Sequence, residues 1–138
     1  MKALTILVCS TSLAIFGCSK PPESDSVVLK GKWSGEEMGR SAPGTASLLV
    51  EGSTLEFHGA DTNEWYKGTF TLREDTNPKQ VVTMITDCPA PQYVGKAANA
   101  IYKIEAGTLT LTGNEPGNPE VPPSFDAPGS RKFVLKKP

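Results

Sequence analysis

The stretch that most constrains the fold is Asn99 to Gly113, NAIYKIEAGTLTLTG. Apolar and polar residues alternate on both sides of Ala106-Gly107, as they do in two half-buried β-strands. Gly107 can supply the positive φ that a tight hairpin turn requires. A hairpin with one apolar face is not stable alone in water. The sequence therefore predicts that this hairpin belongs to a larger sheet.

Six further segments have strand patterns and are separated by turn residues. They are Val27–Gly35, with an extension to Met38, then 45–50, 54–58, 64–73, 79–86 and 131–137. No segment after the N-terminus carries an apolar stripe of helical period. We therefore expect an all-β domain, a small eight-stranded up-and-down antiparallel barrel that follows an N-terminal signal helix. Closure of the barrel would remove exposed sheet edges.

The N-terminus has the features of an export signal. Lys2 precedes an apolar run, 3–16, that is too short to span a bilayer as a helix. Ile15-Phe16-Gly17-Cys18 resembles the lipobox of bacterial lipoproteins, which implies acylation of Cys18 and a signal peptide over 1–17. The alternative is a signal that is cleaved without lipidation.

Residues 18–26 are expected to be the lipidated cysteine and a flexible tether, because the segment is polar and contains two prolines. The barrel domain then covers 27–138. The resemblance implies a membrane partner through the lipid anchor and a cell-envelope location. Ser19 stands where lipoproteins retained in the inner membrane often have Asp, which favours the outer membrane, facing the periplasm.

Short motifs along residues 27–137 resemble, in order, a family of uncharacterised bacterial lipocalin-like domains that are often lipoproteins. They are Leu29-Lys30-Gly31-Lys32-Trp33, Gly68-Thr69-Phe70-Thr71-Leu72, Asn77-Pro78-Lys79, Ile101-Tyr102, Gly107-Thr108-Leu109 and Phe133-Val134-Leu135-Lys136-Lys137. By this resemblance, Gly31 and Trp33 close one end of the barrel beneath a basic side chain, Lys136 or Lys137. The family has no established activity, so the resemblance implies a fold and leaves function open.

Charge and residue inventory argue against several functions. Fourteen basic and fifteen acidic residues give a net charge of −1, so no bulk field attracts nucleic acid. His58 is the only histidine and alternates to the outer face, and Cys88 has no partner thiol once Cys18 is acylated. We therefore expect no metal site, no cofactor and no catalytic residue, hence a non-enzymatic protein.

Loop lengths distinguish the two ends of the predicted barrel. The short connections at 51–53, 74–78 and 106–107 all fall at one end, the closed end. The longer connections fall at the opposite end, the mouth. Three apolar residues on mouth loops are the candidates for contact with a ligand or partner: Met38, Tyr93 and Phe125. For Phe125, an apolar plug that seals the core is the alternative to a lid.

Twelve large apolar residues are expected to point inward, which predicts a packed barrel with at most a shallow pocket at the mouth. Two functions remain open. One is a binding module that takes a small apolar ligand at the mouth. The other is an envelope structural or interaction protein with a filled barrel and no ligand, which presents its loops to an envelope protein. A cavity volume distinguishes them, because sites for small molecules commonly measure about 300 to 1,000 Å³.

Overall fold

The computed structural model of this chain describes residue 17, residues 21–39 and residues 44–138. Cys18 and almost all of the predicted signal peptide, with its helix, lie outside the described residues. The described chain is a closed antiparallel barrel of eight strands, each paired with its neighbours in sequence order. The predicted all-β, up-and-down barrel is therefore confirmed.

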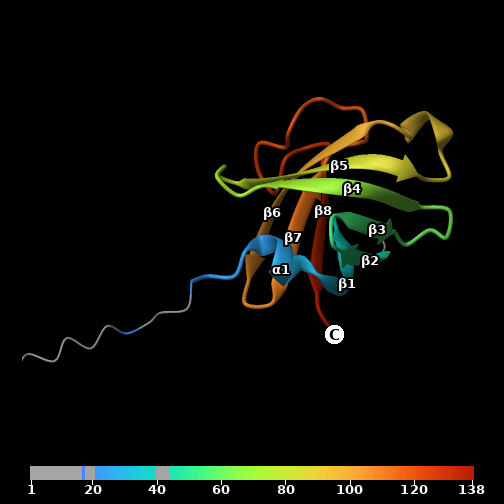
Figure 1. The fold of residues 1–138 in the computed structure, drawn as a ribbon. Helices are drawn as coiled ribbons and strands as arrows, with labels where there is room; N and C mark the ends of the chain where they lie inside the picture. Colours follow the sequence, from blue (N-terminus) through green and yellow to red (C-terminus); the bar gives the residue numbers. More distant parts are fainter. Residues whose placement is uncertain (1–16, 18–20, 40–43) are drawn as a thin grey trace, which may run out of the picture.

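The strands agree with the predicted segments to within a few residues (Figure 1). They are β1 Gly31–Met38, β2 Gly44–Glu51, β3 Thr54–His58, β4 Trp65–Arg73, β5 Lys79–Asp87, β6 Ala97–Glu105, β7 Thr108–Gly113 and β8 Arg131–Lys136. A 3₁₀ turn, η1, covers Pro91–Tyr93. The β6–β7 hairpin turns through Ala106 and Gly107, and Gly107 has the positive φ that the sequence predicts. Ala106 also has a positive φ, which the sequence did not predict.

The first predicted strand was wrong over its first three residues. Val27, Val28 and Leu29 belong to a short helix, α1 Asp25–Leu29, and β1 begins only at Gly31. Gly31 has a φ of 116°, a value that other residues rarely adopt, and this lets the chain turn from the helix into the strand. The predicted tether is correspondingly shorter, because Asp25 and Ser26 are helical.

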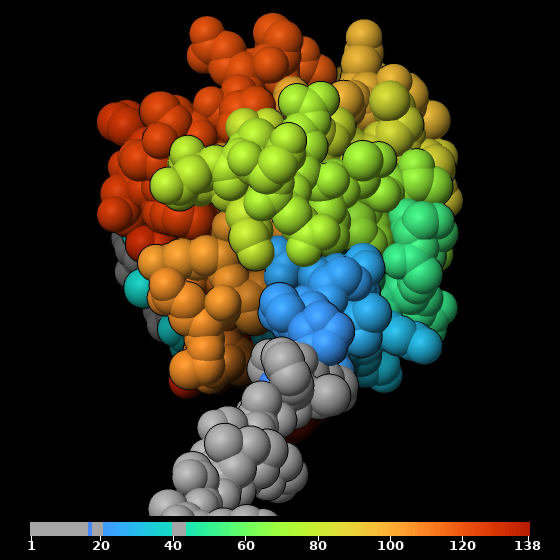
Figure 2. Space-filling view, turned by 60° about the vertical axis from the view of Figure 1, so that its left-hand side comes forward, coloured from blue at the N-terminus to red at the C-terminus, as the bar shows by residue number. Residues whose placement is uncertain are grey.

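Helix α1 fills the closed end of the barrel. Figure 2 shows it between the β4–β5 turn and the β6–β7 turn. Its Leu29 is 6% exposed and belongs to the hydrophobic core. The carbonyl oxygen of Leu29 accepts a hydrogen bond of 2.8 Å from Nε1 of Trp33. The helix is thus the floor of the barrel, at the end opposite the four longer connections.

The inward side chains are those that the alternation predicts. All twelve are either buried in the core or packed against it. They are Trp33, Leu55, Phe57, Tyr66, Phe70, Leu72, Tyr102, Ile104, Leu109, Leu111, Phe133 and Leu135. These side chains do not fill the barrel interior, in contrast to the prediction.

Candidate functional site

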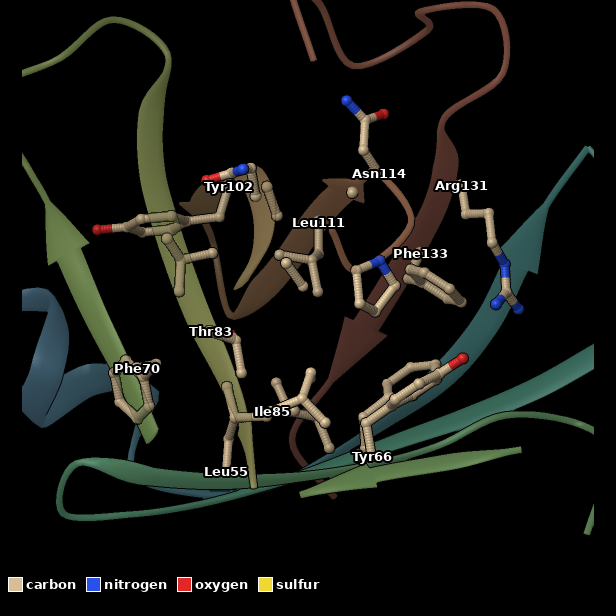
Figure 3. A pocket seen from close by; sticks show the side chains of 18 of the residues that line it. Leu55, Tyr66, Phe70, Thr83, Ile85, Tyr102, Leu111, Asn114, Arg131 and Phe133 are labelled. Atoms are coloured by element: carbon tan, nitrogen blue, oxygen red, sulfur yellow. The ribbon is translucent and has the colours of Figure 1, made fainter. Parts of the chain in front are cut away.

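The barrel interior holds a cavity of about 450 Å³. It extends from Tyr93 and Arg131 at the mouth to Leu29 and Val50 near the floor. Figure 3 shows Leu55, Phe70 and Leu111 pointing into it. The expectation of a packed barrel with a shallow pocket was therefore wrong.

Small inward residues on β5, β6 and β7 explain the empty volume. Ala98 and Ala100 lie on β6, opposite Thr83 and Val81 of β5, and Gly113 is paired with Ala100 from the other side. All five line the cavity. The large residues on the other strands do not reach far enough to fill this space. The prediction failed because it counted the large inward residues and left the small ones out.

Four aromatic rings lie close together toward the mouth. The ring of Phe57 lies 5.0 Å from that of Phe133 in an edge-to-face contact and 6.3 Å from that of Tyr66. Tyr66 in turn lies 6.3 Å from Tyr93. Such rings offer a large, rigid apolar surface to a ligand.

An ion-pair cluster borders this aromatic wall. Arg131 donates two hydrogen bonds to Glu37, of 2.7 Å from Nε and 2.8 Å from Nη2, and its Nη1 pairs with Glu64. The guanidinium also lies over the ring of Phe133, at 5.2 Å. The hydrogen bonds that Arg131 donates to Glu37 outweigh burial and raise the pKa of Arg131. Because Glu37 and Glu64 both pair with Arg131, its guanidinium is not free to bind an anionic ligand.

Of the three predicted mouth residues, only Tyr93 lines the cavity. Its hydroxyl donates to Glu115, and this hydrogen bond raises the pKa of Tyr93. Met38 is 48% exposed, because alternation along β1 turns Glu37 inward and Met38 outward. The structure thus places Met38 on the outer surface.

Phe125 also lies outside the cavity. Its ring is half-buried beneath Nζ of Lys103, 5.0 Å from the ring centroid, and Lys103 faces outward from β6. Its carbonyl oxygen accepts a hydrogen bond from Thr112, a residue of β7 that is fully buried and does not line the cavity. Phe125 is therefore neither a lid nor a plug, because the part of its loop that carries it folds onto the outer face of the barrel.

This loop, residues 114–130, makes a second small core against β6, β7 and β8. Ile101 and Thr112 face away from the cavity, yet both have no exposed surface. Pro122 of the loop is also fully buried. Asp126 holds the loop to Lys132 of β8 by an ion pair of 2.8 Å. Only the two ends of the loop, 114–116 and Gly129, line the cavity, and the sequence pattern does not predict that its middle lies on the outer face.

The predicted closure of the barrel end involves Lys137 as its basic residue. Nζ of Lys137 lies 5.0 Å from the ring centroid of Trp33. It also donates to the carbonyl oxygens of Val28 and Lys30, at 2.7 Å each. Lys136 is exposed and pairs with Ser34 and Thr108 in the sheet, so the choice of Lys136 was wrong.

Two other residues considered for chemistry lie apart from the cavity. His58 is on the outer surface, where its Nε2 lies 2.6 Å from Oε1 of Glu56. Cys88 is buried, and its thiol donates to the carbonyl oxygen of Ala90 at 3.0 Å. Within residues 21–39 and 44–138 the structure contains no group of three His, Cys, Asp or Glu residues able to hold a metal ion. The same residues include no helix long and apolar enough to cross a membrane.

Comparison with protein-family models, with curated proteins and with solved structures found no match to this chain. The closed eight-stranded barrel is shown by the structure itself. Membership of a lipocalin-like family remains a prediction from the motifs.

Proposed function

We propose that this protein is a membrane-anchored binding cup, which takes a small apolar or amphipathic molecule into the barrel interior and does no chemistry on it. One observation carries the proposal: the apolar cavity of about 450 Å³. Its volume falls in the range of about 300 to 1,000 Å³ that is usual for small-molecule sites. This volume counts against the alternative of a filled barrel that acts only through its loops.

The proposed anchor is a lipid on Cys18, seven residues before α1. Because α1 covers the closed end, the tether would attach on the membrane side of the barrel and the mouth would open away from the membrane. Such a protein belongs in the cell envelope, and we place it on the outer membrane, facing the periplasm. The signal pattern and Ser19 support this location.

Filling the cavity tests the proposal. Ala100 lines the cavity, so a larger side chain at position 100 would occupy the empty space. The full chain, held in lipid nanodiscs, should bind butylbenzene in isothermal titration calorimetry, with empty nanodiscs as the blank. Ala100→Phe should weaken this binding by at least about tenfold, since the ring displaces the ligand.

Thr69→Phe is the matched control, because Thr69 is exposed on the outer face of β4. It adds the same ring outside the barrel and should leave the affinity unchanged. Absence of butylbenzene binding to the wild-type chain, or equal binding by the Ala100→Phe variant, would contradict the proposal.

A further inference from the structure

Thr83 places one polar group inside an otherwise apolar part of the cavity. It lies midway along β5, paired with Phe70 of β4 and with Ala98 of β6. Its side chain lines the cavity and is 9% exposed (Figure 3). One branch, the methyl Cγ2, faces Gly68, where an added Cβ would come within 2.9 Å of it. The other branch is the hydroxyl.

The hydroxyl of Thr83 has no hydrogen-bond partner among residues 17, 21–39 and 44–138. Two other hydroxyls on the cavity wall do have partners: Tyr93 donates to Glu115 and Tyr102 to Asp25. The hydroxyl is accessible from the cavity, where water can pair with it. A ligand that displaces this water without replacing its hydrogen bond leaves a buried hydroxyl unpaired, which costs free energy. A group on the ligand would satisfy it.

A second free hydroxyl lies higher on the same side of the barrel. Tyr66 of β4 lines the cavity toward the mouth, and its hydroxyl likewise lacks a hydrogen bond within the described part of the chain. Burial, together with the negative charge of nearby Glu64, raises the pKa of Tyr66. Its phenol therefore stays protonated and can donate a hydrogen bond. The adjoining walls of β4 and β5 thus present hydroxyls at two depths.

Among residues 21–39 and 44–138, the cavity wall offers no free cation to an anionic ligand. Arg131, the cationic side chain on its wall, is held by Glu37 and Glu64. A carboxylate or phosphate that entered would have to displace one of these carboxylates. The ligand is therefore matched by hydrogen bonding within an apolar site and not by charge.

Resting on the proposed function, we infer that the ligand is an uncharged apolar molecule with a hydroxyl or carbonyl group, and that Thr83 determines this specificity by hydrogen bonding to that oxygen. Tyr66 offers a second such contact nearer the mouth. A plain hydrocarbon would leave the Thr83 hydroxyl without a partner.

Three probes with related skeletons test this inference on the full chain in nanodiscs: butylbenzene, its ketone analogue benzylacetone, and the anion phenylbutyrate. Thr83→Val keeps the shape of the side chain and removes the hydroxyl. This variant should bind benzylacetone about two- to tenfold more weakly than wild type, which corresponds to the loss of one hydrogen bond. Its affinity for butylbenzene should be unchanged or higher. Phenylbutyrate should bind wild type at least about tenfold more weakly than benzylacetone.

Thr110→Val is the matched control. Thr110 is a buried threonine of β7 that does not line the cavity, so its replacement should leave the affinities for the three probes unchanged. Equal effects of Thr83→Val on benzylacetone and butylbenzene would overturn the role of Thr83. Binding of phenylbutyrate as tight as that of benzylacetone would overturn the preference for an uncharged ligand. Failure of wild type to bind any probe would instead overturn the binding cup itself.

Discussion

The hydroxyl of Tyr102 donates a hydrogen bond of 2.8 Å to Oδ2 of Asp25, and this bond joins the cavity wall to the first residue of α1. Nζ of Lys79 contacts the same oxygen at 2.8 Å. The backbone N–H of Asp25 donates to Glu74 in the β4–β5 turn. A helix of five residues has little stability of its own, so these contacts fix the floor of the cavity.

Asp25→Asn should lower the free energy of unfolding at neutral pH by about 1 to 3 kcal/mol, because the carboxylate accepts charge-assisted hydrogen bonds. Burial raises the pKa of Asp25, but the hydrogen bonds from Lys79 and Tyr102 outweigh burial and bring it below its ordinary value of 3.8. The stability from Asp25 is therefore present above pH 3.8 and is lost as the pH falls through the lower folded-state pKa. Urea unfolding of both proteins across this range measures it.

Asp126→Asn is the control for this variant. Asp126 pairs with Lys132, but the Asp126 side chain is 85% exposed. Removing its charge should therefore change the free energy of unfolding little. If the difference between wild type and Asp25→Asn stays constant down to the lowest pH at which the protein folds, the account of Asp25 is wrong.

Trp33→Ala should destabilise the barrel by about 3 to 5 kcal/mol, as expected when a large buried aromatic side chain is deleted. Trp33 is 2% exposed and closes the barrel end beneath Lys137. Trp65, a partly exposed residue of β4 beneath Lys67, gives the comparison. In urea unfolding, Trp65→Ala should lower the free energy of unfolding much less than Trp33→Ala does. A loss below about 1 kcal/mol for Trp33→Ala would contradict a structural role.

Phe125→Ala should lower stability by about 1 to 2 kcal/mol, through lost apolar burial and the lost contact with Lys103, and leave butylbenzene affinity unchanged. Tyr93→Ala should weaken the binding of butylbenzene, because Tyr93 lines the cavity. Calorimetric titration of the two variants separates these effects. Weaker binding by the Phe125→Ala variant would mean that Phe125 itself contributes to the binding site.

Cys18→Ser should release the protein from the membrane fraction or leave it as an unprocessed precursor, because the substitution removes the thiol that we expect to be acylated. Fractionation and detergent partitioning measure the change. A variant that is cleaved and still partitions into detergent like wild type would exclude the lipid anchor.

Period-two alternation predicts most of the barrel because eight short strands each need one buried face. The residues that it misplaced are held by contacts distant in sequence. Val27 to Leu29 have strand-forming side chains, but Asp25 holds this segment as a helix through Lys79 and Tyr102, more than fifty positions away. Local propensity cannot contain that information.

The candidate site was less predictable than the fold. Both faces of β5 carry β-branched residues, so the sequence did not show that Thr83 points inward. Glu37 is charged at an inward position, where it pairs with Arg131, 94 residues later in the sequence. Local patterning does not predict such a distant pair. Phe125 was assigned to the mouth because loop length indicates the end of a barrel from which a loop starts, and not the surface onto which it folds.

Native mass spectrometry of the protein purified from the membrane of the cells that make it tests the binding cup most directly. The account predicts that wild type retains a small molecule, seen as a mass above that of the processed chain. The Ala100→Phe variant, whose cavity is filled, should lack this extra mass, whereas Thr69→Phe should keep it. A retained mass that is equal in wild type and Ala100→Phe would contradict the account, as would wild-type protein that carries none and gains none when butylbenzene is added.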